Sequence, residues 1–163
     1  MTKISKALLA VVLALGAIAV LAPRPAPVSS KASRLRLPFS TPPRVLQILD
    51  RSCADCHSDQ TRWPWYSSVP PVSWIVAKHV RDGRRFLNFS RFDGRTARDQ
   101  QDLLHAIARE VKARRMPLAS YTFIHRDARL TGSDAGDLIR WAQRERGPLG
   151  DRGVRLTHAP AMH

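Results

Sequence analysis

Cysteine and acidic residues are scarce in this sequence. Two of its 163 residues are cysteines, and 13 aspartate and glutamate residues face 27 lysine and arginine residues. The cysteines lie three positions apart, so a disulfide between them would close too short a loop to stabilise a domain. No second cysteine or histidine pair stands at zinc-finger spacing. A disulfide framework and a zinc finger are therefore excluded, and the two thiols must serve another purpose.

Strand patterns are missing as well. No segment alternates apolar and polar residues for long enough to predict a strand, whereas apolar residues recur at three- and four-residue steps. We therefore expect an all-α fold. Four helices are predicted, over residues 41–53, 72–87, 96–115 and from 131 onward.

Two of these helices have predictable starts. Thr41 is expected to cap the first helix, with the two prolines that follow it in the opening turn. At the fourth helix the Thr131 hydroxyl can pair with Asp134, three residues on, in a capping box.

The middle helices are bounded by prolines. Prolines exclude helix from the loop at residues 61–71, and Pro117 ends the third helix because the residue before a proline is pushed out of the helical region. The inward face of the second helix is predicted to hold Val72, Ile75, Val76, His79, Gly83 and Phe86. That of the third helix is predicted to hold Leu103, Leu104, Ile107, Ala108 and Val111.

The N-terminus reads as a targeting segment. Lys3 and Lys6 precede an apolar run over residues 7–22, which is the pattern of an export signal. No cleavage site follows it cleanly, so residues 4–22 favour an uncleaved anchor in the inner membrane, with the remainder exported to the periplasmic side. The predicted divisions of the chain are a signal or anchor at 1–22, a Pro-rich linker at 23–39, one domain at 40–146 and a flexible C-terminal tail at 147–163.

The formal net charge is +14 at neutral pH. A basic surface can attract an acidic redox partner or anionic lipid. Arginine is scattered through every segment instead of forming a stripe, and nothing resembles a nucleic-acid-binding module. We therefore expect a protein partner, a membrane contact through the N-terminal anchor, and no nucleic acid.

Residues 53–57 read Cys-Ala-Asp-Cys-His, which is the attachment signature of c-type haem. One helical turn between the thiols suits the spacing of the two vinyl groups of the porphyrin, and the next imidazole can then reach the iron. A thioredoxin-like redox pair would need a βαβ setting, which the helical pattern lacks. We expect one covalently attached haem, with Cys53 and Cys56 as its thioether attachments and His57 as the proximal iron ligand.

The second axial ligand has several candidates. Met1 and Met162 belong to the termini, so Met116 is the only internal thioether, and we expect it to be the distal ligand. His125 is the main alternative. His79, on the inward face of the second helix, is a further one.

Aromatic residues follow closely on the attachment motif. We expect them to wall the haem, with a ring N–H or O–H near a propionate. The four are Trp63, Trp65, Tyr66 and Trp74. Arg62, Arg84 and Arg85 are possible counter-charges for the propionates, although a solvated position is the simpler expectation for each.

Three longer stretches carry a resemblance to a known family. They are C-A-D-C-H-S-D-Q-T-R-W-P-W-Y-S-S-V-P-P-V-S-W from residue 53, H-V-R-D-G-R-R-F-L-N-F-S from residue 79, and M-P-L-A-S-Y-T-F-I-H-R-D-A-R-L-T from residue 116, with W-A at 141–142. Over residues 41–143 the chain resembles the bacterial haem-binding domain family of small exported proteins.

The resemblance implies a cytochrome c-like bundle of about four helices around one covalent haem. It also implies haem binding by Cys53, Cys56 and His57, with Met116 at the matching methionine position. His79 and His125 lie on family motif positions too, so the distal ligand stays open between them and Met116.

Three functions remain in view. A haem with both axial positions filled suits an electron carrier that passes single electrons between exported or membrane partners, and this is the function we expect. A peroxidase-type enzyme subunit would need an open iron and a distal acid–base pair, which the sequence does not show convincingly. A haem-based sensor would need a distal ligand that yields to a small molecule.

Overall fold

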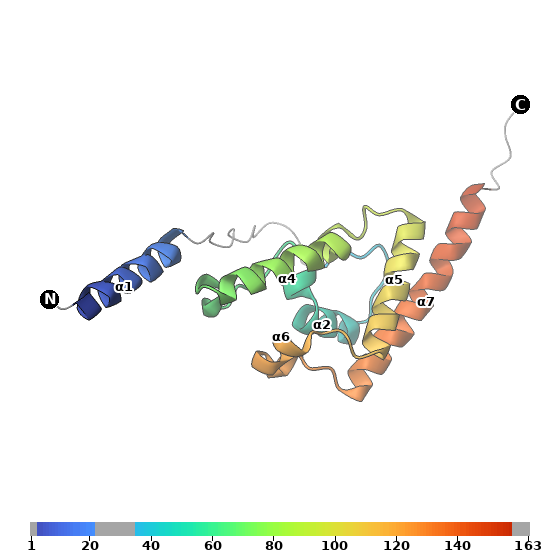
Figure 1. The fold of residues 1–163 in the computed structure, drawn as a ribbon. Coiled ribbons are helices and arrows are strands. Elements are labelled where there is room, and N and C mark those ends of the chain that lie inside the picture. The colour runs from blue at the N-terminus through green and yellow to red at the C-terminus, as the bar shows by residue number, and fades with distance from the viewer. Residues whose placement is uncertain (1–2, 22–34, 158–163) are drawn as a thin grey trace, which may run out of the picture.

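The computed structural model describes residues 3–21 and 35–157, and every regular element in these ranges is helical. The prediction of an all-α fold is confirmed. The first helix, α1 (Lys3–Leu21), stands apart from the others (Figure 1). Among the described residues, no helix has the length and apolarity that crossing a membrane requires.

The first helices of the domain itself are α2 (Pro43–Ser52) and the short α3 (Ala54–His57). The remaining α-helices are α4 (Val72–Phe86), α5 (Ala97–Lys112), α6 (Ala119–Ile124) and α7 (Gly132–Thr157). Three 3₁₀ turns join them, namely η1 (Trp65–Ser68), η2 (Phe89–Arg91) and η3 (Arg126–Ala128).

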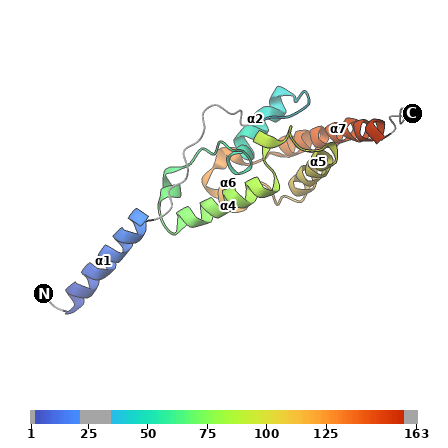
Figure 2. The same ribbon diagram turned by 90° about the horizontal axis from the view of Figure 1, so that it is seen from above.

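The core lies where α2 meets the pair formed by α5 and α7, which run side by side (Figures 1 and 2). Apolar side chains at three- and four-residue spacing put one face of each helix into this core. The buried residues are Val45, Ile48 and Leu49 of α2, Leu104, Ile107 and Val111 of α5, Leu138, Trp141 and Ala142 of α7, and Leu87, Phe89 and Phe92 of the connection after α4. The motif at residues 53–57 follows directly on one of these core helices.

The segment before α2 is part of the domain. Leu35, Leu37 and Phe39 pack against the core, although the linker was predicted to extend to residue 39. The ring of Phe39 lies 6.1 Å from that of Phe92 and 5.9 Å from that of Trp141, measured between centroids. The rest of the predicted linker lies outside the described residues.

Several predicted helix ends differ from the structure. Pro42, not Thr41, is the N-cap of α2, because its extended backbone already sets the direction of the first turn and no side chain caps that helix. The loop at 61–71 contains the 3₁₀ turn η1, which the prolines around it permit. Helix α5 ends at Lys112 because Arg114 has a left-handed backbone, with φ of 55°.

The C-terminal helix is longer than predicted. α7 runs to Thr157, so residues 147–157 are helical where we predicted an irregular tail. Once the packed half of a helix has formed, each further residue adds a hydrogen bond at low cost. Residues 158–163 of the predicted tail lie outside the described residues.

The inward face predicted for α4 is only partly right. Ile75 and Phe86 are more than half exposed, whereas Ser73 and Val80 are buried. Apolar spacing identifies this face of α4, but in the structure its residues line cavities instead of packing into the core. The face predicted for α5 is correct at Leu104, Ile107 and Val111, which are all buried.

Asp134 ties α7 to α2. The Thr131 hydroxyl accepts from the Asp134 backbone N–H, while the Asp134 carboxylate accepts from the Thr131 N–H, which is the predicted capping box. The same carboxylate, only 2 % exposed, accepts hydrogen bonds from Arg44 and Arg51. Burial raises the pKa of Asp134, but the hydrogen bonds from Thr131 and the charges of the two arginines outweigh it, so the pKa is lowered overall.

We expect Asp134→Ala to lower the free energy of unfolding at neutral pH by about 2 kcal/mol, because it removes a helix cap and charged hydrogen bonds. The folded-state pKa lies below its usual value of 3.8, so this stability is present above that pH and is lost as the pH falls. Urea unfolding at pH 7 and at pH 3 should therefore show a difference from wild type that shrinks in acid. Asp137→Ala, which removes a more exposed carboxylate of the same helix, is the matched control and should cost well under 1 kcal/mol.

Candidate cofactor site

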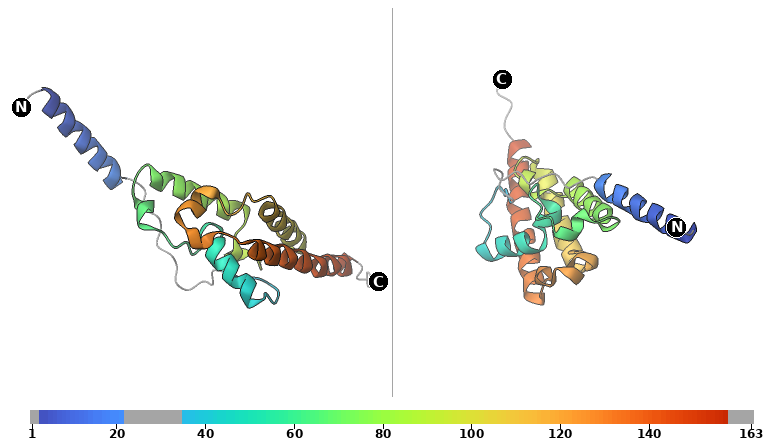
Figure 3. Two further views of the ribbon diagram at one scale, coloured as in Figure 1. Left: turned by 90° about the horizontal axis from the view of Figure 1, so that it is seen from below. Right: turned by 90° about the vertical axis from the view of Figure 1, so that its left-hand side faces the viewer.

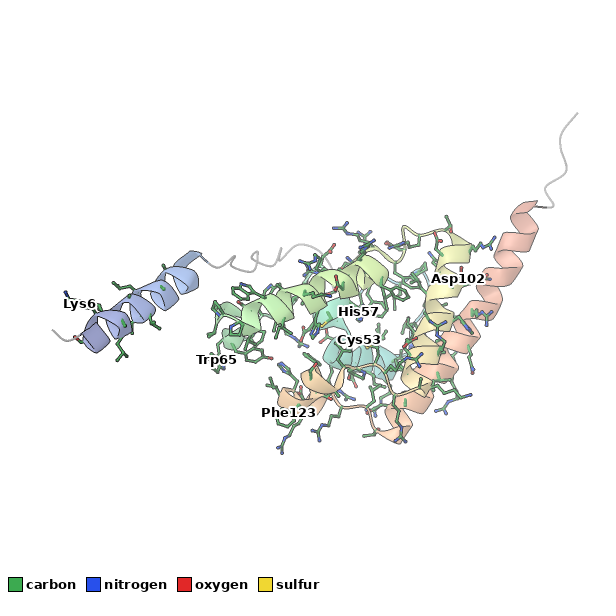
Figure 4. The ribbon with its side chains drawn as sticks, viewed as in Figure 1. Lys6, Cys53, His57, Trp65, Asp102 and Phe123 are labelled. Atoms are coloured by element: carbon green, nitrogen blue, oxygen red, sulfur yellow. The ribbon has the colours of Figure 1, made fainter. Side chains whose placement is uncertain are left out.

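The Cys-Ala-Asp-Cys-His motif occupies the corner between α2 and α3. Cys53 ends α2, where its N–H donates to the Leu49 carbonyl at 3.0 Å, and it begins α3, where its own carbonyl accepts from the His57 N–H at 3.0 Å. The two thiols and the imidazole are thus held by a single helical turn. Figure 4 shows Cys53 and His57 in the middle of the domain, between α2 and α4.

The His57 ring is oriented by the last turn of α4. Its Nδ1 lies 3.0 Å from the Gly83 carbonyl oxygen and 3.1 Å from the Leu87 carbonyl oxygen. A carbonyl can only accept, so Nδ1 must carry the proton, and Nε2 keeps the lone pair that a metal needs. Burial lowers the pKa of His57, and its hydrogen bonds to the two carbonyls only partly offset this, which favours the neutral ring. This is the arrangement of a metal-binding histidine fixed by a backbone carbonyl.

A glycine makes this close approach possible. A Cβ atom added at Gly83 would lie 2.7 Å from the Cys56 carbonyl oxygen, which is closer than real contacts allow. The backbones of α3 and α4 therefore touch at this point. Any larger residue would move α4 away from the His57 ring.

The two thiols are held in the protonated form. Burial, then the neighbouring Cys56, raises the pKa of Cys53 to about 12, and burial, then the charge of Asp55, raises the pKa of Cys56 to about 11. Thiol–disulfide redox motifs depend on a lowered thiol pKa. The site therefore does not resemble a thioredoxin-type redox pair, which agrees with the helical setting.

Two neighbouring cavities adjoin the motif. The first, of about 230 Å³, is lined by Cys53, Cys56 and His57 and by residues of the segment that follows α5. The second, of about 360 Å³, shares Cys53 and His57 with the first and continues along the apolar side of α5. Met116 lines both cavities. The structure thus brings the only internal methionine to the cavities that His57 lines, from 59 positions along the chain.

The two histidine candidates are placed differently. His79 is half-buried and lines the first cavity and a third one of about 150 Å³, which is bordered by residues of α4 and α6. Figure 3 shows the ribbons of these two helices, α4 in green and α6 in orange. His125 lines the third cavity, where its Nε2 is 2.6 Å from the Tyr66 hydroxyl and its ring stacks on Tyr121 with centroids 4.4 Å apart. The ring nitrogen of His125 thus already has a partner away from His57.

The aromatic residues do not wall these cavities as expected. Trp65 is 82 % exposed and Trp74 is 52 % exposed, and Trp63 lines neither of the first two cavities. Tyr66 lines only the third cavity. Nearness in sequence does not predict these positions: Trp65 stands in η1 and Trp74 on α4, and both rings are more than half exposed. Figure 4 shows Trp65 away from Cys53 and His57, near the start of α4.

Two of the three possible counter-charges are bound to protein groups. Arg62 donates to the Asp55 carboxylate, at 3.1 Å from Nε. Arg84 donates to the Ser58 carbonyl oxygen at 2.7 Å and to the Thr61 hydroxyl at 2.8 Å. Both arginines fix the loop that follows the motif, and Arg85 is exposed.

Two site residues carried no recognisable signal in the sequence. Asp55, between the two cysteines, accepts a hydrogen bond from the Tyr121 hydroxyl at 2.9 Å. Tyr121 also lines the first cavity, beside Met116. The two residues are 66 positions apart, and only the folding of α6 onto α3 brings them together.

The donors at the site fit a haem. Within the described residues, no group of three or more histidine, cysteine, aspartate or glutamate side chains could hold a metal ion. A porphyrin brings four nitrogen ligands of its own, so one imidazole and one further donor complete the coordination of its iron. The oriented Nε2 of His57, two adjacent thiols and mainly apolar cavities meet that requirement.

One comparison with known proteins gives a match. A family model described as a haem-binding domain matches residues 11–144. No curated protein and no solved structure matches the chain.

We expect Gly83→Ala to separate α3 from α4 and to weaken the hydrogen bonds of the His57 ring. Alanine normally stabilises a helix interior by about 1 kcal/mol relative to glycine, so a loss of stability would point to the contact with Cys56. Urea unfolding should show a loss of about 1–3 kcal/mol, and purified protein should carry less haem per chain.

Gly132→Ala is the control, because a Cβ atom there meets nothing within 4 Å. It should leave stability and haem content near wild type. A Gly83→Ala protein with the stability and haem content of wild type would contradict the role of the close approach.

Proposed function

Because the chain belongs to the haem-binding domain family, we propose that it is a monohaem c-type cytochrome-like protein that carries single electrons between redox partners outside the cytoplasm. The observation that supports this most directly is the His57 ring, whose Nδ1–H is directed at the Gly83 and Leu87 carbonyls. The tautomer that results is the one that binds iron through Nε2.

In this proposal Cys53 and Cys56 hold the haem as thioethers. Covalent attachment needs no thiolate at rest and tolerates burial, which suits the raised pKa of both thiols. The single turn from Cys53 to His57 then fixes the ring of the cofactor relative to the proximal ligand. The haem supplies the one-electron couple of its iron.

Met116 is the distal ligand that the geometry favours. It lines both of the cavities that His57 lines, whereas His125 is bonded to Tyr66 in another cavity. His79 lines the first cavity but stands on α4, one turn before Gly83, on the helix that already orients the proximal ring.

A filled sixth position favours electron transfer over peroxidase chemistry. With Met116 and His57 both on the iron, peroxide has no open coordination site. A thioether ligand also raises the reduction potential relative to a second histidine. We therefore propose an electron carrier and not an enzyme.

The partner proposed here is an acidic redox protein. The chain carries a formal net charge of +14, which speeds the encounter with a negatively charged partner at low ionic strength. The basic residues followed by an apolar run at the N-terminus support export to the periplasmic side.

Covalent attachment can be tested by denaturation. Haem should remain on the wild-type chain after denaturing electrophoresis and acid extraction. Cys53→Ser and Cys56→Ser should each leave at most one thioether, and the double variant should release all its haem. Complete extraction of haem from the wild-type chain would rule out the c-type assignment.

Distal ligation can be tested by spectroscopy. We expect the ferric protein to show the weak near-infrared band of sulfur-to-iron ligation, and Met116→Ala to abolish it while His125→Ala and His79→Ala keep it. The wild-type protein should also exchange one electron reversibly in a redox titration.

Other results would identify the alternatives. A high-spin ferric spectrum with turnover of hydrogen peroxide would indicate an enzyme, and rapid binding of CO by the reduced wild-type protein would indicate a sensor. A wild-type ferric protein that is low-spin but lacks the band, and that becomes high-spin in His125→Ala but not in Met116→Ala, would assign the distal position to histidine.

A further inference from the structure

The segment that carries Met116 is weakly packed. It runs from the end of α5 into α6, and α6 buries none of its six residues. The Met116 N–H donates to the Glu110 carbonyl over a long 3.4 Å. Core packing therefore does not explain what holds this side of the first cavity in place.

Polar contacts hold α6 instead. The Tyr121 hydroxyl donates to Oδ2 of Asp55 at 2.9 Å, and the Tyr66 hydroxyl lies 2.6 Å from Nε2 of His125 at the far end of α6. Arg129 donates to the Thr122 carbonyl at 3.1 Å, but this bond links α6 only to the segment that follows it. The two tyrosines therefore make the hydrogen bonds from α6 to other parts of the site.

Of the two tyrosines that make these hydrogen bonds, Tyr121 is the closer to Met116. It is half-buried, it lies five residues after the methionine, and both side chains line the first cavity. Burial, together with the charge of Asp55, raises the pKa of the Tyr121 hydroxyl. The phenol therefore stays protonated and remains a hydrogen-bond donor.

Asp55 is a rigid partner for this bond. It lies between Cys53 and Cys56, and its Oδ1 accepts from the Nε of Arg62 at 3.1 Å and from the Arg62 backbone N–H at 3.3 Å. Its own carbonyl oxygen accepts from the Thr61 hydroxyl at 2.6 Å. The carboxylate is thus held by the attachment turn on one side and by the following loop on the other, which leaves Oδ2 directed at Tyr121.

We propose that Tyr121 is a positioning residue, which through its hydrogen bond to Asp55 ties the Met116 segment to the haem-attachment turn and so keeps the methionine sulfur on the iron. The proposal rests on the proposed function, because it concerns the distal ligand of that haem. The bond joins the two sides of the first cavity directly, so the distal segment is positioned by the same turn that carries the cysteines.

The test is Tyr121→Phe in the haem-loaded full chain, which removes one hydroxyl and keeps the ring. Loss of a hydrogen bond to a charged group should raise the population with Met116 off the iron by about tenfold or more. We expect the near-infrared sulfur–iron band to disappear at a lower temperature than in wild type. CO should bind the reduced variant about tenfold faster, and amide exchange over residues 116–125 should accelerate.

Matched variants separate positioning from general loosening. Tyr66→Phe also removes one tyrosine hydroxyl, the one that contacts His125 at the other end of α6. It should change CO binding much less than Tyr121→Phe does. Asp55→Asn keeps an oxygen that can accept from Tyr121, so it should retain more of the band than Asp55→Ala. These differences in ligation would not arise if Tyr121 contributed only to overall stability.

Two outcomes would overturn the proposal, and they are distinguishable. If wild type shows the band and Tyr121→Phe keeps it with unchanged CO binding and amide exchange, the positioning role alone is wrong. If wild type lacks the band, the assignment of Met116 in the proposed function is wrong, and the positioning role falls with it.

Discussion

The contact between α3 and the last turn of α4 is the constraint on which the site depends. Gly83 lets the two backbones touch at the Cys56 carbonyl, and only at that separation do the Gly83 and Leu87 carbonyls reach Nδ1 of His57. One contact therefore sets three things: the distance between the helices, the tautomer of the imidazole and the direction of its free nitrogen. Because the cysteines share the same turn, the whole proximal side of the cavity follows from it.

The two sides of the cavity are built by different forces. The proximal side continues from α2, whose Val45, Ile48 and Leu49 are buried in the core with α5 and α7. The distal side depends on α6, which buries none of its residues and is held by hydrogen bonds. Core packing thus fixes the proximal side, whereas hydrogen bonds hold the distal side. In the proposed function, binding of the sixth iron ligand would therefore depend on single hydrogen bonds.

The excess of arginine has a structural use as well as an electrostatic one. Arg44 and Arg51 join α2 to α7 through Asp134, and Arg62 and Arg84 fix the loop after the motif. A guanidinium can donate several hydrogen bonds in a fixed geometry, so it can join segments that the small core does not reach. In the proposed function, the remaining positive charge would help to steer an acidic partner.

The sequence by itself determined the helical fold and the prediction of haem binding, and it supplied the proposed attachment motif and the candidate distal ligands. These rest on local patterns: three- and four-residue apolar spacing, a five-residue motif at 53–57 and a single internal methionine. Only the tertiary structure decided that His57 presents Nε2, that Trp65 and Trp74 point outward, and that Asp55 meets Tyr121. The orientation of His57 and the bond between Asp55 and Tyr121 depend on contacts between residues 26 and 66 positions apart in the sequence. These contacts form only when α4 and α6 pack onto α3, and no local sequence pattern predicts that packing.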